Sequence, residues 1–308
     1  MSTSKSYYKP LNISSVFRPG LFENRVAIVT GGATGIGKGI TKELLFLGCT
    51  VVIASRKADR LADGAEEIRN WLANTGQRAT LHVVQCNVRN EDEVKKLIST
   101  TVQKFGKLDF LINNGGGQFL SPTADIRLKG WNAVVETNLT GTFLLCREAY
   151  NQWMKEHGGT IVNMAMDMWK GYPYMGHSGA ARAGVVNLTK TLGVEWAQSN
   201  VRVNAVAPGS SIVSPTAAAN YGNVSIFDGV GENIPMKRTG TVEEVCSAVC
   251  FLLSPGAAFI TGETIRIDGG HSYYITPNFR LPDSKPTDVY SWQSKFDADA
   301  AKGPQSKL

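Results

Sequence analysis

A glycine-rich turn between an apolar run and a helix limits most strongly what this chain can fold into. The run Arg25–Thr30 is short and apolar, which predicts a buried strand. It leads into the turn Thr30–Gly37, which reads TGGATGIG, and a helix is predicted over Gly35–Leu47. Glycines let a backbone approach a pyrophosphate closely, and the amino end of a helix supplies N–H donors and a positive dipole. The start of the chain therefore predicts a strand–turn–helix unit that binds a dinucleotide.

Apolar runs and helical periodicity alternate along the rest of the chain. Further strands are predicted at Thr50–Ala54, Leu81–Gln85, Asp109–Ile112, Gly159–Met164, Val201–Val206 and Glu263–Ile267. Helices are predicted at Ala58–Ala73, Glu91–Phe105, Leu128–Glu156 (one helix or two), Ser178–Gln198 and Thr241–Leu253. Apolar strands that alternate with helices predict a parallel sheet with helices on both faces. We therefore expect an α/β fold, a single Rossmann-like domain with a doubly wound parallel sheet.

The 308 residues divide into three parts. Residues 1–20 are polar and predict a flexible extension, and residues 21–275 carry the periodic elements of the domain. Residues 276–308 lose periodicity and predict a flexible tail. Within the domain, Ser210–Arg238 is rich in Ser, Ala, Gly and Asn and is long enough to form a lid over a substrate.

Composition excludes several classes of function. The sequence has no run of about 18 apolar residues, so no membrane span is expected, and its amino end lacks the apolar core of a secretory signal. The net charge is +6, but no long Lys/Arg run or basic stripe with aromatic residues is present, so no nucleic-acid partner is expected. The five cysteines include no CxxC pair, so we expect neither a metal site nor a disulfide framework.

The end of the second predicted strand indicates which dinucleotide is bound. It reads Ala54-Ser55-Arg56-Lys57. A chain that binds NAD places a carboxylate about 20 residues after the glycine-rich turn, for the ribose 2′-hydroxyl, and none is present here. Arg56 can instead pair with a 2′-phosphate through two N–H groups, Ser55 can donate to it, and Lys57 adds charge. The sequence therefore predicts NADPH.

Further motifs carry a resemblance to a known family. They are Asn113-Asn114-Gly115-Gly116, Asn138 in TNLTG, Pro208-Gly209 after the sixth strand, and Asp268-Gly269-Gly270. With the glycine-rich turn, they make residues 22–273 resemble the short-chain dehydrogenases/reductases, with Asn87-Val88 in place of the family's usual Asp-Val. The resemblance implies that the cofactor is bound by Thr30, Gly31, Ala33, Thr34, Gly35, Ile36, Gly37, Ser55, Arg56, Lys57, Asn87, Val88, Asn114, Gly115, Gly116, Arg182, Pro208 and Gly209.

The resemblance also locates the expected catalytic residues. Most members of this family carry a Tyr-x-x-x-Lys pair on a long helix and a Ser at the end of the preceding strand, which donate a proton and polarise a carbonyl. The family's interval back from Pro208 places Ser178 at the Tyr position and Arg182 at the Lys position, and the Ser position falls near Ala165. Asn138 matches the family's catalytic asparagine. The chain thus keeps the asparagine but lacks the Tyr and Ser hydroxyls.

Two explanations compete for the missing tyrosine. Either the chain binds NADPH without catalysis, or its reaction needs no phenol. Reduction of a carbon–carbon double bond conjugated to a thioester is such a reaction, because its main need is a site for the enolate oxygen. Ser178 or a backbone N–H could donate to that oxygen, and Arg182 could supply positive charge. The candidate proton donors are Tyr172, Tyr174 and Asp167, between the fifth strand and the sixth helix, with Tyr174 preferred.

Local sequence sharpens the resemblance within the family. The stretches NNGGGQFLSP, ETNLTGTF and HSGAARAGV are similar to those of peroxisomal trans-2-enoyl-CoA reductases, whose proton-accepting Tyr is replaced here by Val186. This resemblance implies a homotetramer that reduces trans-2-enoyl-CoA to saturated acyl-CoA with NADPH. The triple glycine is also similar to that of 2,4-dienoyl-CoA reductases, which are the alternative. A 3-oxoacyl-CoA reductase is less expected, because ketone reduction most needs the missing Tyr.

The last three residues match a peroxisomal address. A carboxyl-terminal Ser-Lys-Leu is read by an import receptor, and the chain ends Ser306-Lys307-Leu308. The residues before it are polar, as access for a receptor requires. We therefore expect this receptor as a partner, an acyl-CoA as the substrate, and the peroxisome as the location of the protein.

Overall fold

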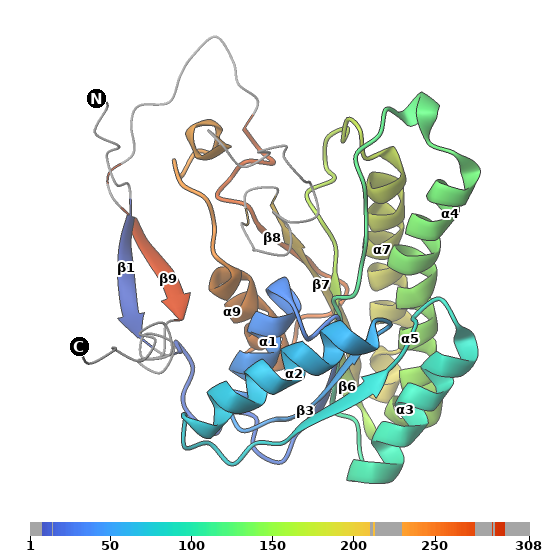
Figure 1. The fold of residues 1–308 in the computed structure, drawn as a ribbon, viewed down its shortest axis with the longest axis vertical. Helices are drawn as coiled ribbons and strands as arrows, with labels where there is room; N and C mark the ends of the chain where they lie inside the picture. The colour runs from blue at the N-terminus through green and yellow to red at the C-terminus, as the bar shows by residue number, and fades with distance from the viewer. Residues whose placement is uncertain are drawn as a thin grey trace, which may run out of the picture.

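The structure, a computed structural model, describes residues 8–13, 15–209, 212, 230–274, 285 and 287–292. It shows a sheet between two layers of helices and a separate pair of strands at one side (Figure 1). The expected loop Ser210–Arg238 lies mostly outside the described residues, and the tripeptide Ser306-Lys307-Leu308 lies entirely outside them. Within the described ranges, no helix has the length and apolarity that a membrane span requires.

The central sheet contains seven parallel strands. Their order is β4-β3-β2-β5-β6-β7-β8, so the direction of winding reverses between β2 and β5. The strands are β2 (Val26–Thr30), β3 (Thr50–Ser55), β4 (Leu81–Gln85), β5 (Phe110–Asn113), β6 (Gly159–Met164), β7 (Val201–Pro208) and β8 (Thr264–Ile267). The predicted doubly wound sheet is confirmed, and ligands bind such sheets where the winding reverses, outside the carboxyl ends of the strands.

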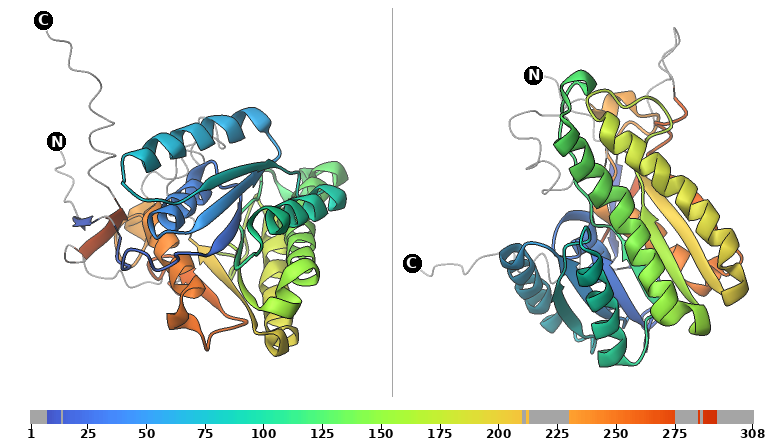
Figure 2. Two further views of the ribbon diagram at one scale, coloured as in Figure 1. Left: turned by 90° about the horizontal axis from the view of Figure 1, so that it is seen from below. Right: turned by 90° about the vertical axis from the view of Figure 1, so that its right-hand side faces the viewer.

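Helices cover both faces of the sheet (Figure 2). One layer contains α1 (Gly35–Phe46), α2 (Ala58–Ala73) and α9 (Val242–Leu253). The other contains α3 (Glu91–Phe105), α5 (Gly141–Ala149) and α7 (Gly176–Glu195), with α4 (Leu128–Val135) against α7. Short helical turns occupy Thr123–Asp125, Lys155–His157 (α6), Ala197–Ser199, Val230–Asn233 and Pro255–Ala257.

The strands are apolar throughout because each one is buried on both sides. Val29 of β2 belongs to the core shared with α1 and α9, whereas its neighbour Ile28 belongs to the core shared with α3 and α5. Both side chains have no exposed surface. Full burial of an aliphatic side chain of this size contributes roughly 1.5–3 kcal/mol to folding, so polar substitutions are costly on either face.

The segment that was expected to form one or two helices contains two π-helical turns. α4 continues into the turn Glu136–Thr140, then into α5, then into a second turn at Tyr150–Met154 that ends in α6. Turns of this kind are rare and occur often at functional sites. The first one carries Asn138, whose side chain is buried.

A second sheet contains two strands, one that precedes the central sheet in the chain and one that follows it. β1 (Tyr8–Ile13) pairs in parallel with β9 (Thr287–Trp292), from Tyr8 opposite Thr287 to Ile13 opposite Trp292. The sequence analysis predicted neither strand, because both lie in polar segments without apolar periodicity. β9 packs on α9, where the hydroxyl of Thr241 donates to the carbonyl oxygen of Tyr290 at 2.7 Å.

A buried carboxylate connects β9 to the domain. The Glu43 side chain of α1 is 1% exposed, and its Oε1 accepts hydrogen bonds from the hydroxyls of Tyr290 at 3.0 Å and Ser15 at 3.2 Å. No cation in the described part of the chain pairs with it. Burial raises the pKa of Glu43 to about 7, and the Tyr290 hydrogen bond opposes that shift only in part.

Candidate functional site

A cavity of about 440 Å³ lies at the carboxyl edge of the sheet, where the winding reverses. The segments that follow β2, β3, β4 and β5 surround it, because parallel strands place these segments at one edge. Of the predicted cofactor residues, the cavity is lined by Thr30, Gly31, Ala33, Thr34, Ser55, Arg56, Lys57, Asn87, Val88, Gly115 and Gly116. The cavity thus contains most of the site expected from sequence.

The glycine-rich turn opens the amino end of α1 toward this cavity. Gly31 and Gly35 have φ of 66° and 53°, in the left-handed region that favours glycine. A Cβ at Gly37 would lie 2.2 Å from the Gly31 carbonyl oxygen, so only glycine fits there. Thr34 precedes the helix without a side-chain cap, and the first turn carries no acidic residue. The backbone N–H groups and the helix dipole therefore fit a pyrophosphate.

The opposite part of the cavity is cationic. Arg56, Lys57, Arg60 and Arg89 line it, and no Asp or Glu is among its described lining residues. Arg89 forms an ion pair with Glu136, whereas the other three cations pair with no carboxylate in the described part of the chain. Three unpaired cations fit a 2′-phosphate and would repel no part of it.

Sequence reasoning missed two of these cations. Arg60 lies in the first turn of α2, four residues after Arg56, and Arg89 lies in the segment after β4. For Arg60, the available signal was its spacing of four residues from Arg56. Arg89 could have been found from its place after a strand end, since such places meet at one edge of a parallel sheet.

Several predicted cofactor residues lie behind the cavity or beyond it. The Asn114 amide donates to the Thr30 carbonyl at 2.9 Å and so joins the ends of β5 and β2. Gly35, Ile36 and Gly37 form the start of α1. Pro208 and Gly209 end β7, where the Gly209 N–H donates to the Ile267 carbonyl at 2.9 Å. These contacts shape the edge of the sheet around the cavity.

Arg182 and Asn138 converge on the triple-glycine segment. Arg182 is 8% exposed, and its Nη1 donates to the Met164 carbonyl oxygen at 2.5 Å. A Cβ at Gly116 would lie 2.2 Å from Arg182 Nη2 and 3.1 Å from Asn138 Oδ1. Asn138 accepts from the Gly117 N–H at 2.9 Å and donates to its carbonyl at 3.0 Å. Burial lowers the pKa of Arg182 to about 10, so the guanidinium stays charged at neutral pH.

Ser178 contacts a residue that the sequence analysis did not single out. Its hydroxyl is fully buried and donates to Gln118 Oε1 at 2.7 Å, with Met166 Sδ at 3.4 Å. A serine hydroxyl can donate one hydrogen bond, and here the Ser178 hydroxyl donates it to the carboxamide oxygen of Gln118. Gln118 also lines the cofactor cavity. The signal for this residue was its place directly after the triple glycine, in the segment that carries the finer resemblance.

The three candidate proton donors lie in the segment between β6 and α7. Tyr174 is 58% exposed and has φ of 65°, and its carbonyl accepts from the Ser121 N–H. Tyr172 lies beside Gly179, with its Cβ 3.7 Å from the position of a Cβ there. Asp167 Oδ2 lies 3.4 Å from His271 Nδ1, and burial raises the pKa of its carboxyl group. The structure thus brings Ser178, Arg182 and Asn138 to one region.

The alternative tyrosine position lies in an apolar cluster. Val186 is 6% exposed and packs with Ala165 and Ala207, against Met168 and Trp169. Ala165 stands where the family's Ser is expected, so that position is also apolar here. Neither position offers a hydroxyl in this chain.

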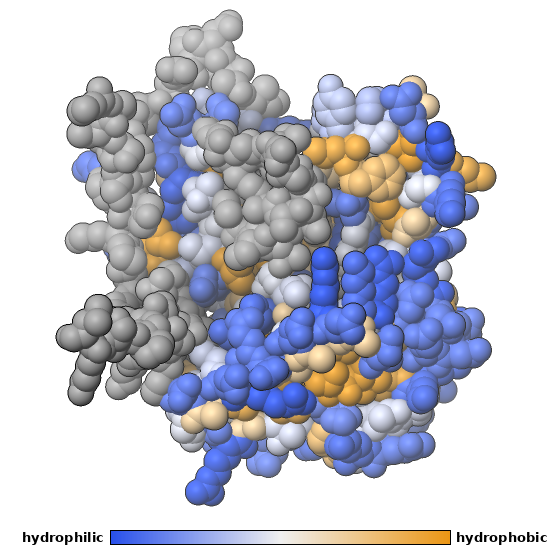
Figure 3. Space-filling view, in the orientation of Figure 1, coloured by the Kyte–Doolittle hydropathy of each residue, from blue (hydrophilic) through white to orange (hydrophobic). Residues whose placement is uncertain are grey.

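Apolar surface extends beyond the cavity. Figure 3 shows it at the upper right, over α4 and the segment that leads to it. The exposed apolar side chains of this part include Phe119, Leu120 and Leu128. Phe119 lines the cavity and packs edge to face on the buried ring of His177, with 4.4 Å between the ring centres. The cavity is therefore cationic on one side and leads to apolar surface on the other.

Comparison with known proteins agrees with this geometry. A family model described as Enoyl-(Acyl carrier protein) reductase matches residues 31–272. A peroxisomal 2,4-dienoyl-CoA reductase of Danio rerio, of the (3E)-enoyl-CoA-producing type, is 34% identical over 256 residues, which are 83% of this chain and 84% of that protein.

Solved structures show the same fold. A citronellol catabolism dehydrogenase of Pseudomonas aeruginosa PAO1 is 47% identical, with a TM-score of 0.73 over 84% of this chain and 99% of that one. A variant of actinorhodin polyketide ketoreductase solved with NADPH is 33% identical, with a TM-score of 0.73 over 84% of this chain and 100% of that one. The chain therefore belongs to the short-chain dehydrogenase/reductase family of oxidoreductases, in the group described as enoyl-(acyl carrier protein) reductases.

Proposed function

We propose that this protein reduces trans-2-enoyl-CoA to saturated acyl-CoA with NADPH. The observation that carries the proposal is the combination, at one sheet edge, of a cavity lined by cations and by none of the described carboxylates with a Ser178–Gln118 hydrogen bond near Arg182. Ser178 stands where most members of the family carry the Tyr. This arrangement suits a reaction that places negative charge on a thioester oxygen and needs no alcohol chemistry. The names of the relatives support acyl-CoA as the substrate class.

The cofactor would be held along the whole length of the cavity. The amino end of α1, with Thr30, Gly31 and Thr34, would bind the pyrophosphate, and Asn87 and Val88 would contact adenine. The 2′-phosphate would bind Ser55, Arg56, Lys57 and Arg60. Arg182, with Gly115, Gly116, Pro208 and Gly209, would border the nicotinamide and its ribose. When bound, NADPH supplies the hydride that the double bond takes up.

The chain's own residues would stabilise the charge that forms on the substrate. As the double bond is reduced, an enolate oxygen develops on the thioester, and the carboxamide of Gln118 would donate to it. Ser178 holds the oxygen of that carboxamide, so it acts as a positioning residue. The Arg182 guanidinium adds positive charge in a buried place, where electrostatic interactions are strong.

A proton must then reach the carbon next to the thioester carbonyl. Tyr174, Tyr172 and Asp167 are the proposed donors, as the sequence suggested. The raised pKa of Asp167 suits a group that carries a proton closer to neutral pH. The variants Tyr172→Phe and Tyr174→Phe test the first two, because full activity in both would leave neither as the donor.

A 2,4-dienoyl-CoA reductase is the second candidate. The printed names of the Danio rerio and Rattus norvegicus relatives favour it, and both proteins are named peroxisomal. A dienoyl substrate makes the same demand for an enolate site, so the geometry of Ser178, Gln118 and Arg182 also suits it. A noncatalytic NADPH-binding protein would need only the cavity.

One assay separates these candidates. Purified full-length protein is mixed with NADPH and trans-2-decenoyl-CoA, and the loss of nicotinamide absorbance is followed, with a 2,4-dienoyl-CoA and a 3-oxoacyl-CoA alongside. We expect fast oxidation of NADPH with the enoyl substrate. Faster oxidation with the dienoyl substrate would favour the second candidate. Tight NADPH binding without oxidation by any of the three would overturn both enzymatic proposals.

We further propose that the protein works in peroxisomes as a homotetramer. Ser306-Lys307-Leu308 would bind the import receptor, and the peroxisomal names of several relatives support this location. Sedimentation of the purified protein measures the oligomeric state directly.

A further inference from the structure

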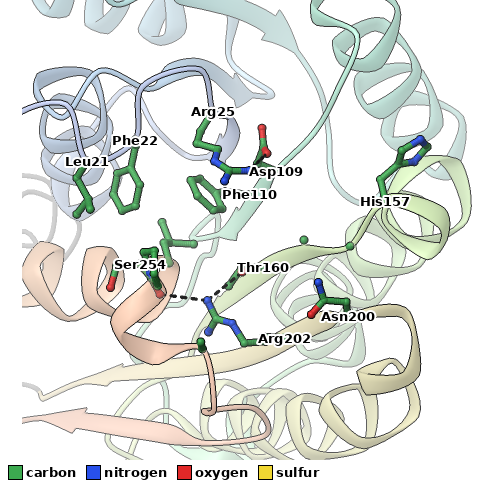
Figure 4. Close-up of a pocket in the computed structure, with 15 residues that line it drawn as sticks. Leu21, Phe22, Arg25, Asp109, Phe110, His157, Thr160, Asn200, Arg202 and Ser254 are labelled. Atoms are coloured by element: carbon green, nitrogen blue, oxygen red, sulfur yellow. Dashed lines mark hydrogen bonds and ion pairs between the residues drawn. The ribbon is translucent and has the colours of Figure 1, made fainter.

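A second cavity lies at the amino edge of the sheet, at the opposite ends of the strands from the cofactor cavity (Figure 4). Its volume is about 330 Å³, and it shares no lining residue with the first cavity. It is formed where β2, β5, β6 and β7 begin, together with the turn at His157 and the segment from Ser254 to Ala258 after α9.

The charges of this cavity do not balance. Arg25 Nη1 pairs with Asp109 Oδ1 at 2.7 Å, and Asp109 is the one carboxylate among the described lining residues. Arg202 also lines the cavity, and no described carboxylate pairs with it. The cavity therefore carries one positive charge, on Arg202, without a counterion.

The hydrogen bonds of Arg202 are all to neutral acceptors. It donates to Thr160 Oγ1 at 3.1 Å, to the Ile260 carbonyl at 3.4 Å and to the Ser254 carbonyl at 3.5 Å. Figure 4 shows the guanidinium between Ser254 and Thr160, with dashed lines to both. Burial lowers the pKa of Arg202, as expected for a cation removed from water without an ionic partner. An anion beside it would relieve this cost.

Part of the remaining wall is apolar, on the side of Phe22 and Phe110, whereas His157 and Asn200 add polar groups. Phe22 and Phe110 pack edge to face, with 5.2 Å between their ring centres. Leu21, Leu253, Pro255 and Ala258 also line the cavity. A ligand with an anionic group for Arg202 and a short hydrocarbon chain for these apolar side chains therefore suits the cavity.

We infer that this cavity binds a monocarboxylate with a short hydrocarbon chain, at a site separate from the cofactor and substrate. The three neutral acceptors leave Arg202 with N–H groups that they do not take up, and a carboxylate oxygen can accept from one of these. One unbalanced charge suits one negative charge, whereas a phosphate dianion would leave a charge unmatched in a partly buried place. The inference does not depend on the reaction proposed above.

Calorimetric titration of the full chain with hexanoate tests the inference. The protein is first saturated with NADPH, so that the cofactor cavity is filled. We expect saturable binding of one hexanoate per chain. Acetate should bind at least tenfold more weakly because it lacks the hydrocarbon chain, and hexylamine should not bind because its charge has the wrong sign. Absence of saturable hexanoate binding would overturn the inference.

Three variants locate the site. Arg202→Gln removes the unbalanced charge and should weaken hexanoate binding at least tenfold. Ala258→Glu keeps Arg202 but supplies a carboxylate at the wall, and it should weaken binding to a similar degree. Val194→Glu adds the same group at a position that is 78% exposed and does not line the cavity, so it should have no effect. If Arg202→Gln fails to fold, Ala258→Glu decides, and unchanged binding in that variant would contradict the site.

Discussion

Arg56 is the single residue whose side chain should matter most for cofactor choice. It lines a cavity without carboxylates and pairs with no acidic group in the described part of the chain. Arg56→Glu should raise KM for NADPH roughly 10- to 100-fold, because a hydrogen bond to a charged group contributes about 1.5–3 kcal/mol and repulsion is added. KM for NADH should change much less. Steady-state kinetics with both cofactors measures this.

The matched control for this prediction is Arg78→Glu. Arg78 is exposed in the connection between α2 and β4 and does not line the cavity. It undergoes the same charge reversal, so equal KM values for NADPH in the two variants would contradict a specific role for Arg56.

The hydrogen bond between Ser178 and Gln118 leads to a second prediction at this scale. If Gln118 stabilises the enolate oxygen, Gln118→Ala should lower kcat about 100-fold, as the loss of one such donor does in other enzymes. Ser178→Ala should lower kcat less, because it only frees the carboxamide. The dissociation constant for NADPH should stay the same in Ser178→Ala, because Ser178 does not line the cofactor cavity, and it is measured separately for Gln118→Ala, because Gln118 does. Ser121→Ala is the control, since that hydroxyl bonds only to a neighbouring carbonyl.

Some residues of the candidate site could be predicted from the sequence, and others could not. Arg182, Asn138 and Ser178 could be placed because family motifs surround them. Gln118 could not, because its role depends on a side-chain contact with a residue 60 positions away. Such contacts follow from how α7 packs on the segment after β5, and no local pattern encodes that packing.

At the scale of elements, the buried contact between α1 and β9 predicts a dependence of stability on pH. The pKa of Glu43 is raised to about 7 in the folded chain, so the folded state holds the proton more tightly than the unfolded state does. Its contribution to stability is therefore complete below about pH 4.5, falls as the pH rises, and levels off above about 7. The total change is at most about 3 kcal/mol.

Glu43→Gln should remove this dependence. The free energy of unfolding is measured with urea at pH 5 and at pH 8. The loss between these two pH values should be smaller in Glu43→Gln than in the unaltered protein, by up to about 3 kcal/mol. Glu66→Gln, at an exposed position of α2, should leave the difference unchanged. Identical losses in the Glu43 and Glu66 variants would contradict the raised pKa of the buried Glu43 carboxyl group.

The strands of the central sheet were predictable because both faces of each strand are buried. Burial on both sides leaves short apolar runs such as Val51–Ala54, which are typical of strands in a parallel sheet covered by helices. β1 and β9 were missed for the opposite reason. Their pairing is with each other, and its signal lies in contacts between the two ends rather than in either local sequence.

At the scale of the whole molecule, the carboxyl-terminal tripeptide predicts where the protein works. Deletion of Ser306-Lys307-Leu308 should leave the rate of NADPH oxidation unchanged, because the cofactor cavity is formed by residues 30–137. The same deletion should move the protein from peroxisomes to the cytosol, as seen by fluorescence microscopy of cells. Peroxisomal location without the tripeptide would contradict the address.

The pairing of β1 with β9 has a consequence for how the molecule is made on the ribosome. Residue 8 leaves the exit tunnel before every strand of the central sheet, and its partner, residue 287, leaves after all of them. The seven strands of the central sheet all lie between them in the chain, so that sheet can assemble before β1 has a partner strand. The contact between β1 and β9 thus forms after the central sheet, and a nascent chain that stalls just before residue 287 carries a complete dinucleotide cavity beside an unpaired β1.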